Sequence, residues 1–126
     1  MTEDELVADW RDLLARYHAT WCALDRALRE GHGLGASEFE VLDQMADSPL
    51  DKPSVRMQEL AAGAHLSQSA LSRVVARLDA DGFVTRNMCD TDRRGIFVEL
   101  TAAGRRKHAE AQATHRSVLA AALTPA

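Results

Sequence analysis

The stretch from Leu60 to Thr101, LAAGAHLSQSALSRVVARLDADGFVTRNMCDTDRRGIFVELT, decides the fold of this 126-residue chain. It begins with a short helical segment, a tight turn and a second helical segment after Ser67. In the second segment, apolar residues at helical spacing define a buried face: Leu71, Val74, Val75 and Leu78. The opposite face is therefore polar and basic, and it carries Gln68, Ser69, Ser72, Arg73 and Arg77.

The second helix has start and stop signals at its two ends. The hydroxyl of Ser67 can accept a hydrogen bond from the free amides of the first turn. Gly82 follows Asp81 at a position where a left-handed residue commonly ends a helix. The sequence thus delimits this helix on both sides.

Two segments of alternating polarity follow, at residues 84–88 and 96–100, and this pattern is typical of a small hairpin. The loop between them, CDTDRRG at residues 89–95, contains two acids and two arginines and is too polar for a core. Helix, turn, helix and hairpin in this order predict a winged helix-turn-helix, with the loop as its wing.

A long amphipathic helix is expected from about Asp4 to Glu30. It carries an apolar stripe at spacings of three and four: Leu6, Trp10, Leu13, Tyr17, Trp21, Leu24 and Leu28. A helix of this length extends beyond a small domain. We therefore expect the stripe to form a homodimer interface, together with Val118 and Leu119 of the last helix.

The remaining segments complete a three-part organisation. The glycine-rich GHGLGAS at residues 31–37 is a break, after which Ser37 and Glu40 have capping-box spacing and predict a helix with Phe39 facing inward. A short strand at residues 55–57 and a helix at 58–64 should precede the turn. Thr101 should cap a last helix to about Leu123, and the Thr-Pro pair at 124–125 is typical of the start of another helix.

We accordingly divide the chain into a dimerisation helix at residues 1–34, a winged helix-turn-helix lobe at 35–101, and an incomplete C-terminal dimerisation helix at 102–126.

The composition indicates a globular protein of the cytoplasm. The chain is 46% hydrophobic and 27% charged, which suits one soluble domain. There is no apolar run of about 18 residues, and the N-terminus is acidic, so neither a membrane span nor a signal peptide is expected. The two cysteines, Cys22 and Cys89, are far apart, which argues against a disulfide framework and a structural zinc site.

The net charge of −4 is unevenly distributed. Residues 65–107 contain eight basic and five acidic residues, a balance of +3, so the rest of the chain carries −7. A basic face on an acidic body attracts phosphate locally and disfavours indiscriminate wrapping of DNA. This distribution is compatible with a nucleic-acid partner near the nucleoid.

The run DRRGIFVELT at residues 92–101, preceded by RLDADGFVTR at 77–86, resembles the signature of the multiple antibiotic resistance regulator (MarR) family. The resemblance covers nearly the whole chain. It implies a mainly α fold with a small β-hairpin wing and long dimerisation helices. It also implies a bacterial transcription regulator, usually a dimeric repressor that small phenolic or other ligands, oxidation or metals release from DNA. The chain departs from the family pattern in two ways. His65 stands where the family often has glycine, and the further C-terminal helix that closes the family's dimer is absent from the sequence.

The predicted DNA contacts lie on the second helix and the hairpin. An amide such as that of Gln68 can pair with adenine, and the guanidinium of Arg73 with guanine, if the start of the helix enters the major groove. The resemblance implies that Arg94 enters the minor groove and that Asp92 orients it. The complete predicted set is Ser67, Gln68, Ser69, Ser72, Arg73, Arg77, Arg86, Asp92, Arg93 and Arg94.

An aromatic or carboxylate-bearing effector is expected between the first helix and the DNA-binding lobe. By helical position and by resemblance, its lining would be Trp10, His18, Trp21 and Phe39, although the same residues also suit a core. No cofactor is expected.

Other functions have weaker support in the sequence. Cys22, close to Tyr17, could sense oxidants, or it could be a small core residue. Cys89 has no evident activating base, and the histidines predict no metal site, since His108 and His115 share a helix at a spacing of seven, too far for an i, i+4 pair. A protein-binding winged-helix scaffold and a thiol-dependent enzyme stay as alternatives, and no phosphate loop or paired-carboxylate motif favours an enzyme.

Overall fold

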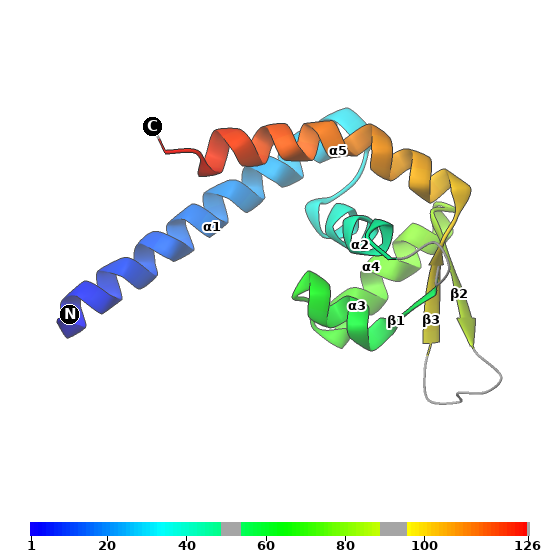
Figure 1. Ribbon diagram of the computed structural model, residues 1–126, viewed down its shortest axis with the longest axis horizontal. Helices are drawn as coiled ribbons and strands as arrows, with labels where there is room; N and C mark the ends of the chain where they lie inside the picture. Colours follow the sequence, from blue (N-terminus) through cyan, green and yellow to red (C-terminus); the bar gives the residue numbers. More distant parts are fainter. Residues whose placement is uncertain (49–53, 89–95, 126) are drawn as a thin grey trace.

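Five helices and three strands form the parts of the chain that the computed structural model describes, residues 1–48, 54–88 and 96–125 (Figure 1). In chain order the elements are α1 (Glu3–His32), α2 (Ala36–Ala46), β1 (Ser54–Arg56), α3 (Met57–Ala64), α4 (Gln68–Ala80), β2 (Val84–Met88), β3 (Ile96–Leu100) and α5 (Ala102–Leu123). This arrangement confirms the predicted mainly α fold with a small hairpin. The helix-turn-helix consists of α3 and α4.

The turn between α3 and α4 depends on a histidine in a left-handed conformation. His65 has φ 56°, and the backbone N–H of Leu66 donates to the carbonyl of Ala61 at 3.0 Å. Histidine tolerates this region better than most residues other than glycine, asparagine and aspartate. On the other side of the turn, Ser67 caps α4, because its Oγ accepts from the N–H of Ala70 at 3.1 Å. At the end of α4, Gly82 has φ 81°, as its position predicted.

The three strands form an antiparallel sheet in the order β1-β3-β2. Val98 of β3 faces Val55 of β1 on one side and Arg86 of β2 on the other. The strand expected at residues 55–57 is therefore present as β1, one residue earlier, and it extends the hairpin at the edge of β3. Thr101 ties the sheet to α5: its hydroxyl donates to the carbonyl of Gly82 at 2.7 Å and accepts from the N–H of Gly104 at 3.0 Å.

The core surrounds α2, which lies between α1, α3, α4 and α5. Phe39, Val41, Leu42 and Met45 of α2 are buried and pack with apolar residues of the other elements. The predicted start of α2 was wrong. The helix begins after Gly35, whose N–H donates to the carboxylate of Glu38 at 3.3 Å, and Ser37 is not the cap. The N–H of Ala36 is satisfied from α1 instead, by the carboxylate of Asp25 at 2.9 Å.

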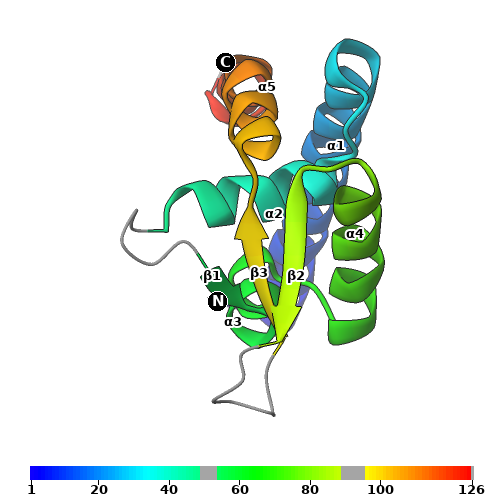
Figure 2. The same ribbon diagram turned by 90° about the vertical axis from the view of Figure 1, so that its right-hand side faces the viewer.

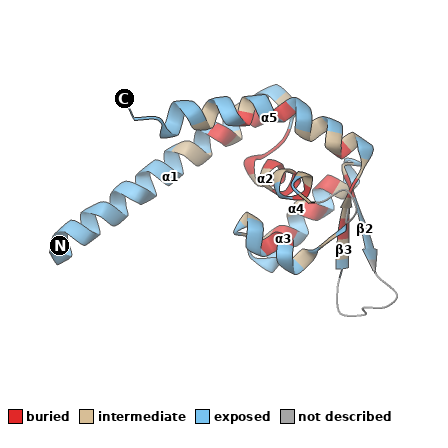
Figure 3. Cartoon of the chain, viewed as in Figure 1, coloured by how far each residue is buried: buried red, intermediate tan, exposed pale blue. Residues whose placement is uncertain are grey.

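The C-terminal part of α1 packs beside α5 and α2, whereas its N-terminal half extends away from the lobe (Figure 1). Leu24 and Leu28 are consequently buried within the chain, and the expectation that they face a partner subunit was wrong for these two residues. The rest of the stripe toward the N-terminus is exposed (Figure 3), namely Leu6, Trp10, Leu13 and Tyr17. Within the described segments, no helix combines the length and the apolar character needed to span a membrane.

Candidate nucleic-acid interface

The outward face of α4 is a continuous polar surface. Leu71, Val75 and Leu78 are fully buried beneath it, which fixes the rotation of the helix about its axis. Figure 2 shows α4 on the outer side of the lobe, next to the hairpin. The predicted contact residues that the rotation brings to the surface are Ser67, Gln68, Ser69, Ser72, Arg73 and Arg77. The N–H groups of the first turn of α4 are at the start of this surface, where backbone amides can bind an anion.

Arg73 and Arg77 lie on the flank of this face that is turned toward α1. Together with residues of α1 and α2 they line a cavity of about 380 Å³, whose lining is Trp21, Asp25, Arg29, Gly35, Ser37, Glu38, Leu66, Ala70, Arg73, Val74 and Arg77. Arg77 Nη1 donates to Oε1 of the buried Glu38 at 3.4 Å. This ion pair could not be predicted from sequence patterns, because its two residues are 39 positions apart.

Asp25 and Arg29 form a second ion pair in the same cavity, with 2.8 Å between Asp25 Oδ2 and Arg29 Nε. The backbone N–H of Ala36 and the Arg29 side chain donate to Asp25, and these hydrogen bonds lower the pKa of its carboxyl. The same pairing raises the pKa of Arg29. Asp25 therefore stays charged and joins α1 to the start of α2.

On the hairpin, Arg86 of β2 pairs with Asp79 of α4, with 3.1 Å between Nη2 and Oδ2. The pairing fastens the hairpin to α4 and leaves nearly half of the Arg86 side chain exposed. Arg56 of β1, which was not among the predicted contact residues, lies over the ring of Phe97 at 5.4 Å from its centroid. The predicted wing residues Asp92, Arg93 and Arg94, and also Cys89, lie outside the described residues.

The four residues expected to line an effector pocket are not brought together. Trp21 lines the cavity next to Arg73, but Trp10 is exposed toward the N-terminal end of α1, and His18 contacts Cys22. Phe39 is fully buried, with its ring stacked on those of His108 and His115 at centroid distances of 5.4 and 4.4 Å. Phe39 is thus a core residue, and its assignment to a pocket was wrong.

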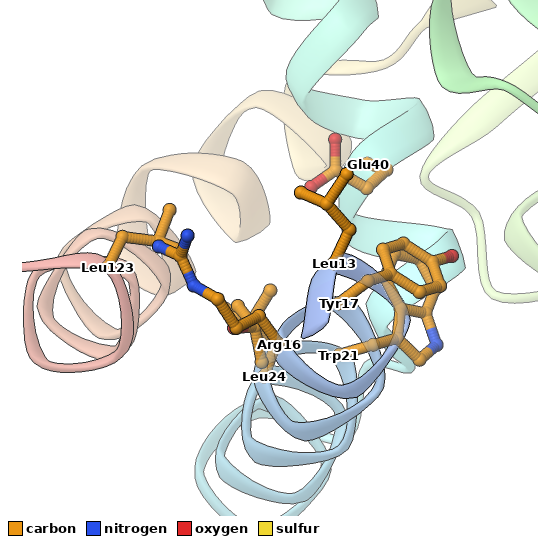
Figure 4. A pocket seen from close by; sticks show the side chains of 8 residues that line it. Leu13, Arg16, Tyr17, Trp21, Leu24, Glu40 and Leu123 are labelled. Carbon is orange, nitrogen blue, oxygen red and sulfur yellow. The ribbon is translucent and has the colours of Figure 1, made fainter. Parts of the chain in front are cut away.

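A second cavity, of about 370 Å³, opens between α1 and the end of α5 (Figure 4). Its lining is mainly apolar: Leu13, Arg16, Tyr17, Thr20, Trp21, Leu24, Glu40 and Leu123. It is continuous with the exposed stripe of α1, since Leu13 and Tyr17 belong to both. Val118 and Leu119, predicted at the dimer interface, are half-buried on α5.

Cys22 is exposed and is not the small core residue that its position also allowed. Its Sγ lies 3.6 Å from Nε2 of His18, one turn earlier on α1. Among the described residues there is no group of three or more His, Cys, Asp or Glu side chains that could hold a metal ion.

Comparisons with known proteins agree with this geometry. A model of the MarR family matches residues 32–95. Sco3205, a MarR family transcriptional regulator from Streptomyces coelicolor solved in complex with DNA, is 32% identical, with a TM-score of 0.85 over 97% of this chain and 74% of that one. AbsC, a MarR family regulator from the same organism, is 28% identical, with a TM-score of 0.82 over 97% and 80% of the two chains.

CouR from Rhodococcus jostii RHA1, solved with bound p-coumaroyl-CoA, is 27% identical, with a TM-score of 0.75 over 91% of this chain and 78% of that one. No curated protein matches the chain in sequence. The family match and the similarity to Sco3205 extend from the helix-turn-helix to nearly the whole fold. The chain therefore belongs to the MarR family of winged-helix transcriptional regulators.

Proposed function

We propose that the protein is a homodimeric repressor that binds a pseudo-palindromic operator through α4 and the wing, and that a small molecule releases it. The observation that carries the DNA-binding role is the capped α4, whose exposed face presents Gln68, Ser69, Ser72 and Arg73 beside a basic flank. Sco3205, a relative of the same fold, was solved in complex with DNA. Chromosomal DNA as the partner places the protein in the cytoplasm, at the nucleoid.

Each side chain has a role that follows from its chemistry. Gln68 and Arg73 are the proposed base readers, because an amide fits the edge of adenine and a guanidinium fits that of guanine. Ser67, Ser69, Ser72, Arg77, Arg86 and Arg93 are proposed to contact phosphates, which fix the register without reading sequence. Arg94, oriented by Asp92, is proposed to enter the narrow minor groove of A·T-rich flanks.

The dimer is proposed to form through α1 and α5. Leu6, Trp10, Leu13 and Tyr17 are exposed on one stripe, and large exposed apolar patches usually mark interfaces. The apolar cavity between α1 and the end of α5 continues this stripe. Residues 1–34 and 102–126 are thus the proposed dimerisation segments, with 35–101 as the DNA-binding lobe.

The proposed effector is an aromatic or carboxylate-bearing compound that binds in the cavity between α1 and α4. Trp21 offers an aromatic surface there, and Arg29, Arg73 and Arg77 offer positive charge. CouR, a relative, was solved with p-coumaroyl-CoA, an aromatic thioester. An effector releases DNA only if it binds the DNA-free arrangement more tightly than the DNA-bound one.

Oxidant sensing through Cys22 is a second candidate function. Its exposed thiol lies 3.6 Å from His18 Nε2, within hydrogen-bonding distance for sulfur. If Cys22 senses oxidants, peroxide should weaken DNA binding by the wild type and not by Cys22→Ser. Equal loss in both would exclude this role.

The experiment that tests DNA binding is selection of randomised duplexes at fixed salt, together with a mobility shift on the DNA flanking the protein's own gene. Arg73→Ala should cost about 1 to 3 kcal/mol and relax the preference at one position of each half-site. Arg94→Ala should weaken binding mainly on sites with narrow A·T-rich flanks, and Asp92→Ala should reproduce part of that loss. A wild-type protein that selects no sequence would instead support a protein-binding scaffold.

A further inference from the structure

Glu38 is a carboxylate buried under the flank of α4, with only 4% of its side chain exposed. A buried carboxylate needs hydrogen bonds or a counter-charge, because its desolvation costs several kcal/mol. Within the described residues, Glu38 accepts from the N–H of Gly35 at 3.3 Å and from Nη1 of Arg77 at 3.4 Å, both at Oε1. Charge-assisted hydrogen bonds are usually about 2.7–2.9 Å long, so both contacts are loose.

The guanidinium of Arg77 contacts Glu38 through a single nitrogen, Nη1. Its side chain is 62% exposed, and the contact with Glu38 uses one of the five N–H donors of the guanidinium. Arg77 and Arg73 line the same cavity on this flank of α4. A phosphate oxygen that approached this flank would therefore compete with Glu38 for Arg77.

A second cation lies next to Glu38. A Cβ added at Gly35 would lie 2.7 Å from Arg29 Nη2 and 3.3 Å from Glu38 Oε1, so both groups lie against the same point of the backbone. The charge of Glu38 also contributes to the raised pKa of Arg29. If Arg77 moves away, Arg29 is still near enough to compensate the buried carboxylate. Four side chains of alternating charge thus extend from α1 across the start of α2 to α4, in the order Asp25, Arg29, Glu38 and Arg77.

We infer that Glu38 is a positioning residue that holds Arg77 back from DNA and thereby lowers the affinity of α4 for phosphate, an inference that rests on the proposed function. Glu38 acts as an internal substitute for a phosphate group. When DNA binds, Arg77 is shared between Glu38 and the DNA backbone, so its contact with phosphate forms only in part, while Arg29 remains beside Glu38. The free energy that Arg77 contributes to DNA binding is therefore the difference between its interaction with phosphate and its interaction with Glu38.

The test measures DNA affinity over a range of salt concentrations for wild type, Glu38→Gln and a matched control, Asp47→Asn. Asp47 is exposed at the C-terminal end of the same helix, so the control removes the same charge at the opposite end of α2 from Glu38. Glu38→Gln should bind about three- to tenfold more tightly at low salt, because loss of the ion pair frees Arg77, whose own side chain is mostly exposed. Its plot of log affinity against log salt should be steeper by up to about 0.9 for each protomer. Asp47→Asn should resemble wild type.

The double variant Glu38→Gln with Arg77→Ala separates positioning from a general charge effect. If Glu38 acts through Arg77, Glu38→Gln should change neither affinity nor salt dependence in the Arg77→Ala background. The inference is overturned if Glu38→Gln binds no more tightly than wild type while melting normally, or if its full gain persists without Arg77.

Arg77→Ala alone provides a measurement that does not depend on the folding of Glu38→Gln. Glu38 already offsets part of the charge of Arg77. Removal of Arg77 should therefore make the slope of log affinity against log salt shallower by less than half of the roughly 0.9 that a free phosphate contact contributes in each protomer. A reduction by the full amount would overturn the inference. These outcomes presuppose a wild-type protein that binds DNA, and its failure to do so would contradict the proposed function itself.

Discussion

Among the glycines that the structure describes, Gly104, in the first turn of α5, leaves the least room for an added methyl group. A Cβ there would overlap the carbonyl oxygen of Phe83 and lie 2.8 Å from Leu100 Cδ1. The close approach exists because Thr101 binds the carbonyl of Gly82 and draws the start of α5 onto the end of α4. Gly104 is therefore required by packing and not by its backbone dihedral angles.

We expect Gly104→Ala to destabilise the fold by about 1 to 3 kcal/mol, the usual cost of overpacking a close contact. Gly31→Ala is the matched control, since a Cβ at Gly31 meets nothing within 4 Å and the residue is in α1. It should be neutral or stabilise the protein by up to about 1 kcal/mol. Urea unfolding of both variants measures the difference, and equal midpoints would contradict the packing at Gly104.

The sequence predicted those single residues whose role depends on their immediate neighbours. Ser67, Gly82 and Thr101 each follow or precede a periodic segment, and the structure has each of them at the helix end that was expected. The sequence could not predict Glu38 as the partner of Arg77. Such a pair depends on how α2 packs against α4, and helical periodicity within either segment contains no information on that.

Among the elements, α5 is fastened to α2 by a small polar cluster. Asp43 of α2 accepts from Nε2 of His108 at 2.7 Å and from two guanidinium nitrogens of Arg116 at 3.0 and 3.2 Å. Burial opposes the ionisation of Asp43, but the hydrogen bonds from Arg116 and His108 outweigh it, and the pKa of Asp43 is lowered from 3.8.

We expect Asp43→Asn to lose about 1.5 to 3 kcal/mol of stability at neutral pH, the range for hydrogen bonds to a charged group. Because the folded-state pKa is below the unfolded one, the contribution of Asp43 is complete above pH 3.8 and is lost as the pH falls through the folded-state pKa. The difference between wild type and Asp43→Asn should therefore shrink below about pH 4. Denaturant titrations at several pH values, with Asp9→Asn as an exposed control, measure this. A difference that grew on acidification would contradict it.

The start of α2 illustrates why element boundaries are harder to predict than elements. Ser37 and Glu40 have the spacing of a capping box, yet the helix begins two residues before the expected first position. Asp25 of α1 satisfies the N–H of Ala36, and Glu38 satisfies that of Gly35. A cap supplied by another helix is a tertiary contact. Glu38, three residues after Gly35, was the local signal that could have identified the true start.

At the scale of the whole molecule, the N-terminal half of α1 exposes more apolar surface than a monomer needs. The exposed fractions of Trp10 and Leu13 are 59% and 58%. The sequence predicted the stripe as a whole but not where the chain itself covers it, because that depends on the path of α5. Leu24 and Leu28 are covered within the chain, so substitutions that test a dimer must be placed closer to the N-terminus.

We expect Trp10→Asp with Leu13→Asp to give a folded monomer at micromolar concentration, because charged residues would remove apolar contact from a dimer without disturbing the core. Arg11→Asp introduces the same residue in the same turn but off the stripe, and it should stay dimeric. Sedimentation equilibrium measures the assembly, and thermal unfolding checks the fold. A wild-type chain that sediments as a monomer at this concentration would contradict the proposed interface.

The proposed two-fold dimer also determines the form that we expect of its operator. Two copies of α4 that enter successive major grooves on one side of DNA lie about 34 Å apart, so the half-sites should be centred roughly 10 base pairs apart. Five base pairs inserted between the half-sites rotate one of them by about half a turn and move it away from the second α4. The affinity should then fall to that of a single half-site, a loss of roughly tenfold or more, because each half-site contact contributes several kcal/mol. Five base pairs inserted outside the half-sites should leave it unchanged. Equal affinity for the parent and the centrally extended duplex would mean that each protomer binds DNA independently, and the link between the α1 interface and operator spacing would then be wrong.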